Sequence, residues 1–440
     1  MNKRINQVLI SVRQTLRTPY FGFVQGHAHL RTEDLKRIKS LVGLQSDDVI
    51  ADYENQFGKL VGEGKAVSYA AARMGFYELM RQLRITKDDE IILLGATCAM
   101  MVNAVIKVGA TPIYSDIDQA TYGSSALEIA KHITPRTKMI VAQHSFGIPC
   151  DIEPIVGLAK ERKIFLLEDC ALTLGSKING TIVGNFGDAA LFSTDHSKPL
   201  NTLIGGLLYT KDHFLASRLK DSQARLPSLS KSRQLALFRR IMIETHYCNP
   251  SRYGRLDLID IYEIVRKRYF GRSKDFLDED SGVEEITSYP YPSKLPSFLA
   301  MIGLFEIARW KDVKQQRKDL LRSLIKIVME SNLSSVLPRC YTDPKLDIVP
   351  IRFALNWEYS DDVIKKIGSF LNDDWVWFRT PIIATNIPLE SFGYQKGNCP
   401  ISEKIGPQMV NIPCNVSGQF HKDLIVRVEE SFPRTSPKDA

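Results

Sequence analysis

Short apolar segments that alternate with helical segments constrain the fold of this chain more than any other feature. Residues 90–94 (EIILL), 139–143 (MIVAQ) and 164–168 (IFLLE) have the length and composition of buried strands. Helical spacing of apolar residues separates them, over 100–108 and 154–162. This alternation predicts a largely parallel sheet with helices on both faces, completed by strands at 112–115, 189–193 and 206–210.

The rest of the chain divides around this α/β segment. We expect a helical arm at residues 1–60, a large α/β domain at 61–296, a connecting helix at 297–334 and a smaller α+β domain at 335–440. Residues 211–290 are rich in Arg and Lys and have helical spacing without a strand pattern, so we expect a basic helical insertion there. Its charge fits contact with anionic lipid, neutralisation of a substrate diphosphate, or a solvated or dimer-forming surface.

Composition and charge exclude several classes of protein. The 440 residues carry a formal net charge of +8, from 58 basic and 50 acidic side chains, which is too mild an excess for a nucleic-acid-binding protein. The seven cysteines are dispersed, which argues against a disulfide framework or a zinc site and favours the cytoplasm. There is no signal peptide and no apolar run of ~18 residues, so we expect no transmembrane segment.

The residues that follow the predicted strands carry the chemistry, because ligands of parallel sheets bind at the carboxyl ends of the strands. Asp169 follows the strand at 164–168, Ser193 ends the next strand, and Lys198 lies in the loop after it. A lysine amine forms an imine with an aldehyde and then moves protons. A carboxylate keeps a pyridine nitrogen protonated, and hydroxyls with helix N-terminal amides bind phosphate. Singly, each residue has an ordinary structural role; together they favour an enzyme that uses pyridoxal 5'-phosphate (PLP).

Six segments, in order along the chain, resemble the DegT/DnrJ/EryC1/StrS family of PLP-dependent sugar aminotransferases. They are 67–80 (VSYAAARMGFYELM), 109–118 (GATPIYSDID), 144–152 (HSFGIPCDI), 166–176 (LLEDCALTLGS), 183–206 (VGNFGDAALFSTDHSKPLNTLIGG) and 398–414 (NCPISEKIGPQMVNIPC). The resemblance implies PLP-dependent transferase fold type I, with a large, mostly parallel α/β domain and a smaller C-terminal α+β domain. It also implies that the site lies between the domains.

The resemblance assigns roles to particular residues. It implies that Lys198 carries the cofactor as a Schiff base, that Asp169 pairs with its pyridine nitrogen and that Ser193 binds its phosphate. Ala72 and Arg73 would lie at the phosphate turn, where they would supply backbone amides. His144 would lie near the cofactor or the substrate.

The chain departs from the family pattern at three places. Cys98 stands where an aromatic residue usually stacks on the pyridine ring, so a thiol contact would replace stacking. Leu172 stands where a glutamine often contacts the phenolic oxygen of the cofactor. The phosphate turn reads Ala71-Ala72-Arg73 instead of Ser-Gly-Thr. These changes indicate a divergent branch.

The function implied by the resemblance is transfer of an amino group, from a donor such as glutamate, to a nucleotide-linked keto-sugar in surface polysaccharide or glycoside biosynthesis. A homodimer is implied as well. Two alternatives stay open: another PLP reaction, namely sugar dehydration or amination of a non-sugar ketone, and a catalytically silent member. A neighbouring branch that dehydrates sugars has histidine in place of the lysine. Here Lys198 remains, and we expect His196 to be an ordinary loop residue.

The sequence contains one pair of closely spaced histidines near the N-terminus. His27 and His29 have a spacing that a metal could use, but no partner cluster accompanies them in the sequence. We therefore expect both at the surface.

Overall fold

The computed structural model of the chain describes residues 19–256, 258–259, 292–331, 333–357, 361–372, 378–385 and 387–432. At the centre of its larger part lies a seven-stranded sheet with the order β1-β10-β9-β6-β5-β2-β4. The strands from β9 to β4 run parallel, whereas β10 is antiparallel to both of its neighbours. They are β1 (Lys65–Tyr69), β2 (Glu90–Leu94), β4 (Thr111–Ser115), β5 (Thr137–Gln143), β6 (Phe165–Asp169), β9 (Ala189–Ser193) and β10 (Gly206–Thr210). This confirms the predicted largely parallel sheet, to which β1 adds an unpredicted edge strand.

Both faces of the sheet are buried. Successive residues of a strand point to opposite sides, so one strand contributes to the core on each face. Ile91 and Leu93 belong to the hydrophobic cluster on one face, and Ile92 between them belongs to the cluster on the other. The first face is covered by α4 (Ala72–Gln82), α5 (Ala99–Val108) and α8 (His213–Ala224). The second is covered by α3 (Asp47–Val61), α6 (Ala126–Ala130), α7 (Ile152–Arg162) and the first turns of α11 (Ser297–Glu330). The helices therefore lie in two layers around the sheet.

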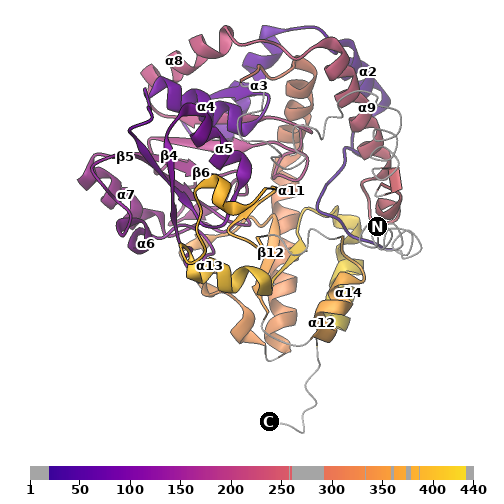
Figure 1. The fold of residues 1–440 in the computed structure, drawn as a ribbon. Coiled ribbons are helices and arrows are strands. Elements are labelled where there is room, and N and C mark those ends of the chain that lie inside the picture. The colour runs from indigo at the N-terminus through magenta and orange to yellow at the C-terminus, as the bar shows by residue number, and fades with distance from the viewer. Residues whose placement is uncertain are drawn as a thin grey trace.

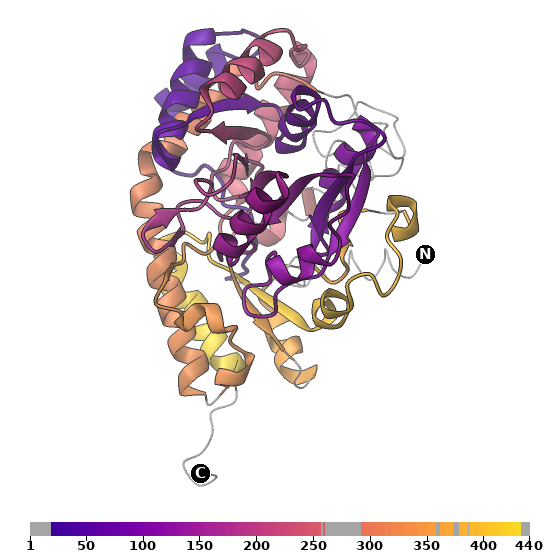
Figure 2. The ribbon, with the colours of Figure 1, turned by 90° about the vertical axis from the view of Figure 1, so that its left-hand side faces the viewer.

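The long helix α11 joins the sheet-containing part of the molecule to the C-terminal part. It has 34 residues and runs along most of the molecule, as Figures 1 and 2 show from two directions. Its first turns pack beside the sheet, whereas Leu320, Leu324 and Val328 belong to a second core. That core surrounds the antiparallel pair β12 (Arg352–Asn356) and β14 (Met409–Pro413), with α12 (Asp361–Gly368) and α14 (His421–Ser431). One helix thus contributes to both cores.

Short elements complete the described residues. β3 (Thr97–Cys98) pairs in parallel with β13 (Ile382–Ile383), and β7 (Lys177–Ile178) pairs with β8 (Thr181–Ile182) and β11 (Leu346–Asp347). Both small sheets therefore connect the two parts of the molecule. The others are α13 (Pro400–Ile405) and 3₁₀ turns at Ser334–Val336, Arg339–Thr342, Leu389–Phe392, Gly406–Gln408 and Gly418–Phe420.

The described residues of the segments predicted as an arm and as an insertion pack against this frame. α3 packs closely against α11 at Gly303, where a Cβ atom would lie only 2.3 Å from the Tyr53 ring. Within the predicted insertion, the structure describes residues 211–256 and 258–259, which include α8 and α9 (Lys231–Tyr247) and no strand. Residues 257 and 260–290 lie outside the description. α9 runs beside α2 (Thr32–Ser40) in Figure 1, and the Gly43 amide after α2 donates to Gln234 of α9 (2.9 Å).

The prediction that His27 and His29 lie at the surface is wrong for His27 and holds in part for His29, whose side chain is 25% exposed. The His27 side chain is fully buried, and the two rings approach the same carboxylate oxygen of Glu306 on α11, at 3.4 and 3.2 Å. Arg309 donates to His29 Nδ1 (3.0 Å) and to Glu306 (3.3 Å). The partner acid lies 279 residues from His27, so the sequence spacing could not reveal it.

The described residues include all seven cysteines, and each is a free thiol. In the described part of the chain, no helix combines the length and the hydrophobicity needed to cross a bilayer.

Candidate functional site

A cavity of about 360 Å³ opens at the carboxyl edge of the sheet and brings together most of the predicted site residues. Five of them line it: Ala72, Arg73, Cys98, Ser193 and Lys198. A second cavity of about 370 Å³ lies beside the start of β6 and contains none of them. Most of the predicted site residues therefore lie at the first of these two cavities.

Lys198 lies in the loop of residues 194–205 between β9 and β10, which we call the lysine loop. Its base is closed by Thr194 and Thr202, whose hydroxyls lie 2.6 Å apart. Gly205 is needed beside them, because its φ is +146° and a Cβ atom there would lie 2.5 Å from the Thr194 hydroxyl. Two long-range bonds hold the outer part: Asn201 donates to the carbonyl of residue 25 (2.8 Å), and buried Arg317 of α11 donates to that of residue 199 (3.0 Å). The lysine loop is therefore attached to elements on several sides.

Asp169 lies beside the floor of this cavity. It ends β6, is 4% exposed and pairs with Leu191 of β9, which lines the cavity together with Ala171. Its Oδ1 accepts a hydrogen bond from the Ala171 amide (2.9 Å). Burial raises the pKa of Asp169, and the Ala171 hydrogen bond and the charge of Lys198 act in the opposite direction. The Lys198 charge therefore favours the ionised form of this carboxylate, although burial has the larger effect.

The neighbouring acid, Glu168, has a different environment. Its two oxygens accept hydrogen bonds from the amides of Gly184, Phe186 and Gly187, at 2.7–2.8 Å. His144 Nε2 lies 3.1 Å from the same carboxylate, and His144 Nδ1 accepts from a backbone amide (3.0 Å). The His144 ring therefore carries its proton on Nε2 and donates to Glu168. Glu168 therefore connects the end of β6 to the backbone of residues 184–187 and to His144.

His144 is adjacent to the cavity but does not line it. Its backbone amide, directly after β5, donates to the carbonyl of Asp169 at the end of β6 (3.1 Å), so the two residues are neighbours. The ring is fully buried and faces Glu168. Any contact of His144 with a ligand stays a prediction.

The start of α4 offers backbone amides to the cavity. Ala71 is extended before the helix, and no side chain at this position caps the first amides. Ala71, Ala72 and Arg73 all line the cavity. Gly206 of β10 lies directly behind them, since a Cβ atom there would be 2.4 Å from the Ala72 backbone. An uncapped helix start beside a cavity is a typical anion site.

The two unusual positions have different surroundings. Cys98 ends β3, is half-buried and lines the cavity. Leu172 is 5% exposed and belongs to the hydrophobic core of the C-terminal part. The Leu172 side chain therefore contributes to packing in that core.

Two residues of the cavity were missed by the sequence argument. Arg352 begins β12, is 2% exposed, and holds its guanidinium carbon 4.0 Å from the centre of the Phe23 ring. No sequence motif marks it, because its place depends on packing between the two parts of the molecule. His196, which we expected to be an ordinary loop residue, lines the cavity and contacts Glu244 of α9. Its closeness to Lys198 in sequence was the one available signal.

Comparison with known proteins gives the family. The DegT/DnrJ/EryC1/StrS aminotransferase family matches residues 31–241. The uncharacterized protein MJ1066 of Methanocaldococcus jannaschii is 32% identical over 370 residues, which is 82% of this chain and 83% of that protein. The chain belongs to the DegT/DnrJ/EryC1/StrS aminotransferase family. The resemblance seen in the sequence is thereby confirmed.

Other relatives align over a shorter stretch. GDP-perosamine synthase of Escherichia coli O157:H7 is 38% identical over 169 residues, which is 38% of this chain and 46% of that protein. A UDP-N-acetyl-3-dehydro-alpha-D-glucosamine 3-aminotransferase of Acidithiobacillus ferrooxidans is 36% identical over 168 residues, again 38% and 46%. The match therefore spans about half the length of these relatives.

Solved structures share the fold of this chain. DesV of S. venezuelae, in complex with a ketimine intermediate, has a TM-score of 0.67 at 19% identity, over 96% of this chain and all of that one. The aminotransferase of Psychrobacter cryohalolentis has a TM-score of 0.67 at 18% identity, over 91% and 94%. These likenesses confirm the predicted fold class.

Proposed function

We propose that this member of the family is a PLP-dependent aminotransferase that transfers an amino group, from a donor such as glutamate, to a nucleotide-linked keto-sugar. One observation carries the proposal: Lys198 lines a cavity at the carboxyl edge of the sheet, and buried Asp169 pairs with Leu191, which lines the same cavity. The names of the two relatives above, which refer to GDP- and UDP-linked sugars, support the substrate class.

The residues around the cavity fit the cofactor. The amides at the start of α4 and the Ser193 hydroxyl would bind its phosphate. The Asp169 carboxylate would pair with its ring nitrogen, and the Lys198 amine would bind its aldehyde. A cavity of about 360 Å³ is within the usual range for a small-molecule site. When bound, PLP supplies an electron sink for the substrate carbon.

The chain itself supplies charge and proton transfer. Asp169 is buried, and among the described residues its carboxylate accepts one amide hydrogen bond. A positive charge beside it, such as a protonated ring nitrogen, would stabilise the carboxylate. The Lys198 amine is the group that moves a proton at the reacting carbon. Closure of the lysine loop by the Thr194–Thr202 contact keeps that amine in the cavity.

A coupled assay tests the proposal. Glutamate and a set of nucleotide-linked keto-sugars are supplied, and release of 2-oxoglutarate is measured. We expect release by the wild type and none by Lys198→Ala. Lys160→Ala, at the second cavity, is a matched control that keeps full activity. Sugar turnover without 2-oxoglutarate would indicate dehydration instead, and a colourless wild-type protein would indicate a silent member.

The remaining proposals concern the assembled protein. We propose a cytoplasmic homodimer, with the free cysteines as support for a reducing compartment. We also propose that the chain divides into an arm at 1–60, a large domain at 61–296, a connecting helix at 297–334 and a small domain at 335–440. Sedimentation analysis of the purified protein tests the dimer, which a monomeric mass would exclude.

A further inference from the structure

We propose that Glu244 of α9 is a positioning residue that holds His196, as an imidazolium, between two carboxylates and so fixes the lysine loop. The proposal deepens the proposed function and rests on it, because it concerns the loop that presents Lys198. It assigns a role to α9, which belongs to the predicted basic helical insertion at residues 211–290.

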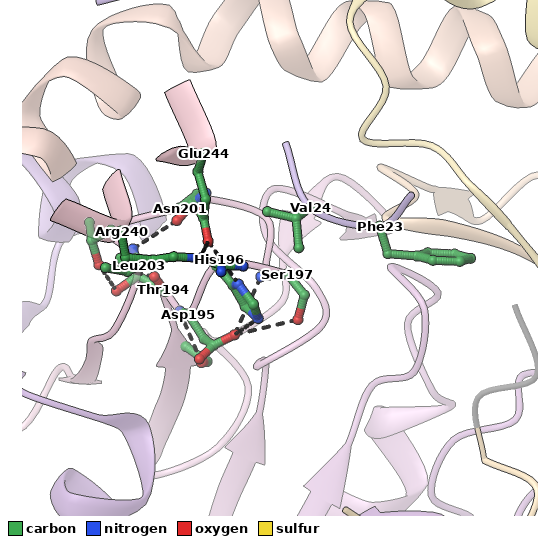
Figure 3. A network of polar contacts seen from close by, with 12 residues as sticks. Phe23, Val24, Thr194, Asp195, His196, Ser197, Asn201, Leu203, Arg240 and Glu244 are labelled. Atoms are coloured by element: carbon green, nitrogen blue, oxygen red, sulfur yellow. Dashed lines mark hydrogen bonds and ion pairs between the residues drawn. The ribbon is translucent and has the colours of Figure 1, made fainter. Parts of the chain in front are cut away.

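The geometry places the His196 ring between two acids, as Figure 3 shows. Nδ1 lies 3.2 Å from Glu244 Oε1, and Nε2 lies 3.7 Å from Asp195 Oδ1. Carboxylates only accept hydrogen bonds, so Nδ1 is best satisfied with a proton, and a second proton on Nε2 gives the ring a positive charge at ion-pair distance from Asp195. The ring is 20% exposed, and Glu244 is fully buried. The arrangement therefore favours the charged form of His196.

The charges around the ring balance in that form. Asp195 faces it from the lysine loop, and Glu244 from α9, where Arg240 Nε also contacts Glu244 Oε1 (3.0 Å). The N-terminal segment at the cavity contributes uncharged Val24. Two carboxylates then face one guanidinium and one imidazolium. A neutral imidazole would leave one partly buried negative charge uncompensated, which is unfavourable.

The pKa values have the matching directions. Burial alone lowers the pKa of His196, but the carboxylates of Asp195 and Glu244 outweigh it and raise the value to about 9. Burial alone raises the pKa of Glu244, but His196 and Arg240 outweigh it and lower the value to about 2. Both groups are therefore charged at neutral pH.

The anchored ring lies within the lysine loop, two residues before Lys198. The His196 amide donates to the carbonyl of Leu203 across the loop (3.1 Å), and the Lys198 amide donates to that of Asp195 (3.0 Å). A ring fixed to α9 thus fixes both sides of the turn that carries the amine. Misplacement of a catalytic group by about 1 Å can lower a rate about 10²-fold, so the anchor matters for the reaction.

The first experiment measures the charge of His196. Glu244→Gln removes the negative charge and keeps the side-chain shape. Glu306→Gln is the matched control, since Glu306 also contacts buried histidine and arginine but does not line the cavity. Ring-labelled histidine NMR, assigned with His196→Gln, should give a pKa of about 9 in the wild type and Glu306→Gln, and a value lower by more than one unit in Glu244→Gln. An ordinary wild-type value of about 6.5 would overturn the proposal.

The second experiment measures the loop and needs no activity. Amide hydrogen exchange of residues 196–203 should be at least about tenfold faster in Glu244→Gln and in His196→Gln than in the wild type, because local opening controls exchange. Glu306→Gln should leave it unchanged. If Glu244→Gln does not fold, His196→Gln carries the test, since its ring is partly exposed. Unchanged exchange overturns the proposal, whether or not the protein proves to be an aminotransferase.

The third experiment uses the active enzyme. Glu244→Gln should lower kcat about 10–100-fold with little change in the KM for the nucleotide sugar. The loss should grow as pH rises through the lowered pKa of His196, and Glu244→Asp, which keeps the charge, should restore part of the rate. A pH profile identical to that of the wild type would contradict a positioning role. Absence of transamination in the wild type would instead refute the proposed function, leaving the first two experiments to judge Glu244.

Discussion

The end of β6 and the inner face of α9 each bury a carboxylate beside the lysine loop, and the surroundings of the two differ. Glu244 on α9 contacts His196 and Arg240, and its pKa is lowered to about 2. Asp169 on β6 accepts one amide hydrogen bond among the described residues, and burial raises its pKa. A carboxylate already paired with cations stabilises the structure, whereas a buried carboxylate with few partners is suited to receive a positive ligand.

The largest expected effect separates the two carboxylates by activity. Asp169→Asn removes the charge that would stabilise a protonated ring nitrogen, so we expect kcat to fall about 10²–10³-fold. Glutamate-dependent amino transfer by the purified variant measures this. Wild-type kcat in Asp169→Asn would remove Asp169 from the site.

The next effect concerns the neighbour of Asp169. Glu168→Gln removes a charge that three backbone amides and His144 share, and one of its two acceptor oxygens becomes a donor. We expect the free energy of unfolding to fall by about 3 kcal/mol. Denaturant unfolding measures it. A fall of less than about 1 kcal/mol would show that Glu168 is not a structural anchor.

A smaller effect tests the α9 region through pH. The pKa of His196 is raised in the folded protein, so its stabilising contribution is complete below about 6.5 and is lost as pH rises through about 9. We expect the wild type to lose on the order of 2 kcal/mol over that range relative to His196→Gln. Parallel stability curves for the two proteins would refute the charged state of His196.

The smallest effect concerns stability at Asp169. A carboxylate whose pKa is raised by folding is less favourable in the folded state than in the unfolded chain at neutral pH. Asn removes that penalty and can still accept the Ala171 hydrogen bond. We therefore expect cofactor-free Asp169→Asn to be slightly more stable than the wild type, as thermal unfolding at neutral pH would measure. A clear loss of stability would show that Asp169 is already well satisfied.

The sheet and the residues at its strand ends could be predicted from the sequence because their signals are local. The alternation of apolar strands with helices gave the parallel sheet, and the rule that ligands bind at strand ends then pointed to Asp169, Ser193 and Lys198. The patterns that predict this sheet and these three residues each lie within a short segment of the chain. The orientation of β10 was not predicted, because an apolar strand pattern is the same in either direction.

The missed residues depend on contacts between distant segments. Glu244 is one acid on a helix with many basic residues, and no local pattern shows which side chain faces the lysine loop 48 residues earlier. Arg352 reaches the cavity from the C-terminal part, and His27 meets an acid on α11. Packing decides these positions, and a single sequence does not record it.

Covalent trapping tests the central claim most directly. The wild-type protein with added PLP is reduced with borohydride, digested and mapped by mass spectrometry. We predict one reduced cofactor adduct, on the peptide that contains Lys198, and no adduct in Lys198→Ala. An adduct at a different lysine, or no adduct in the wild type, would contradict the assignment of Lys198 as the cofactor-binding amine.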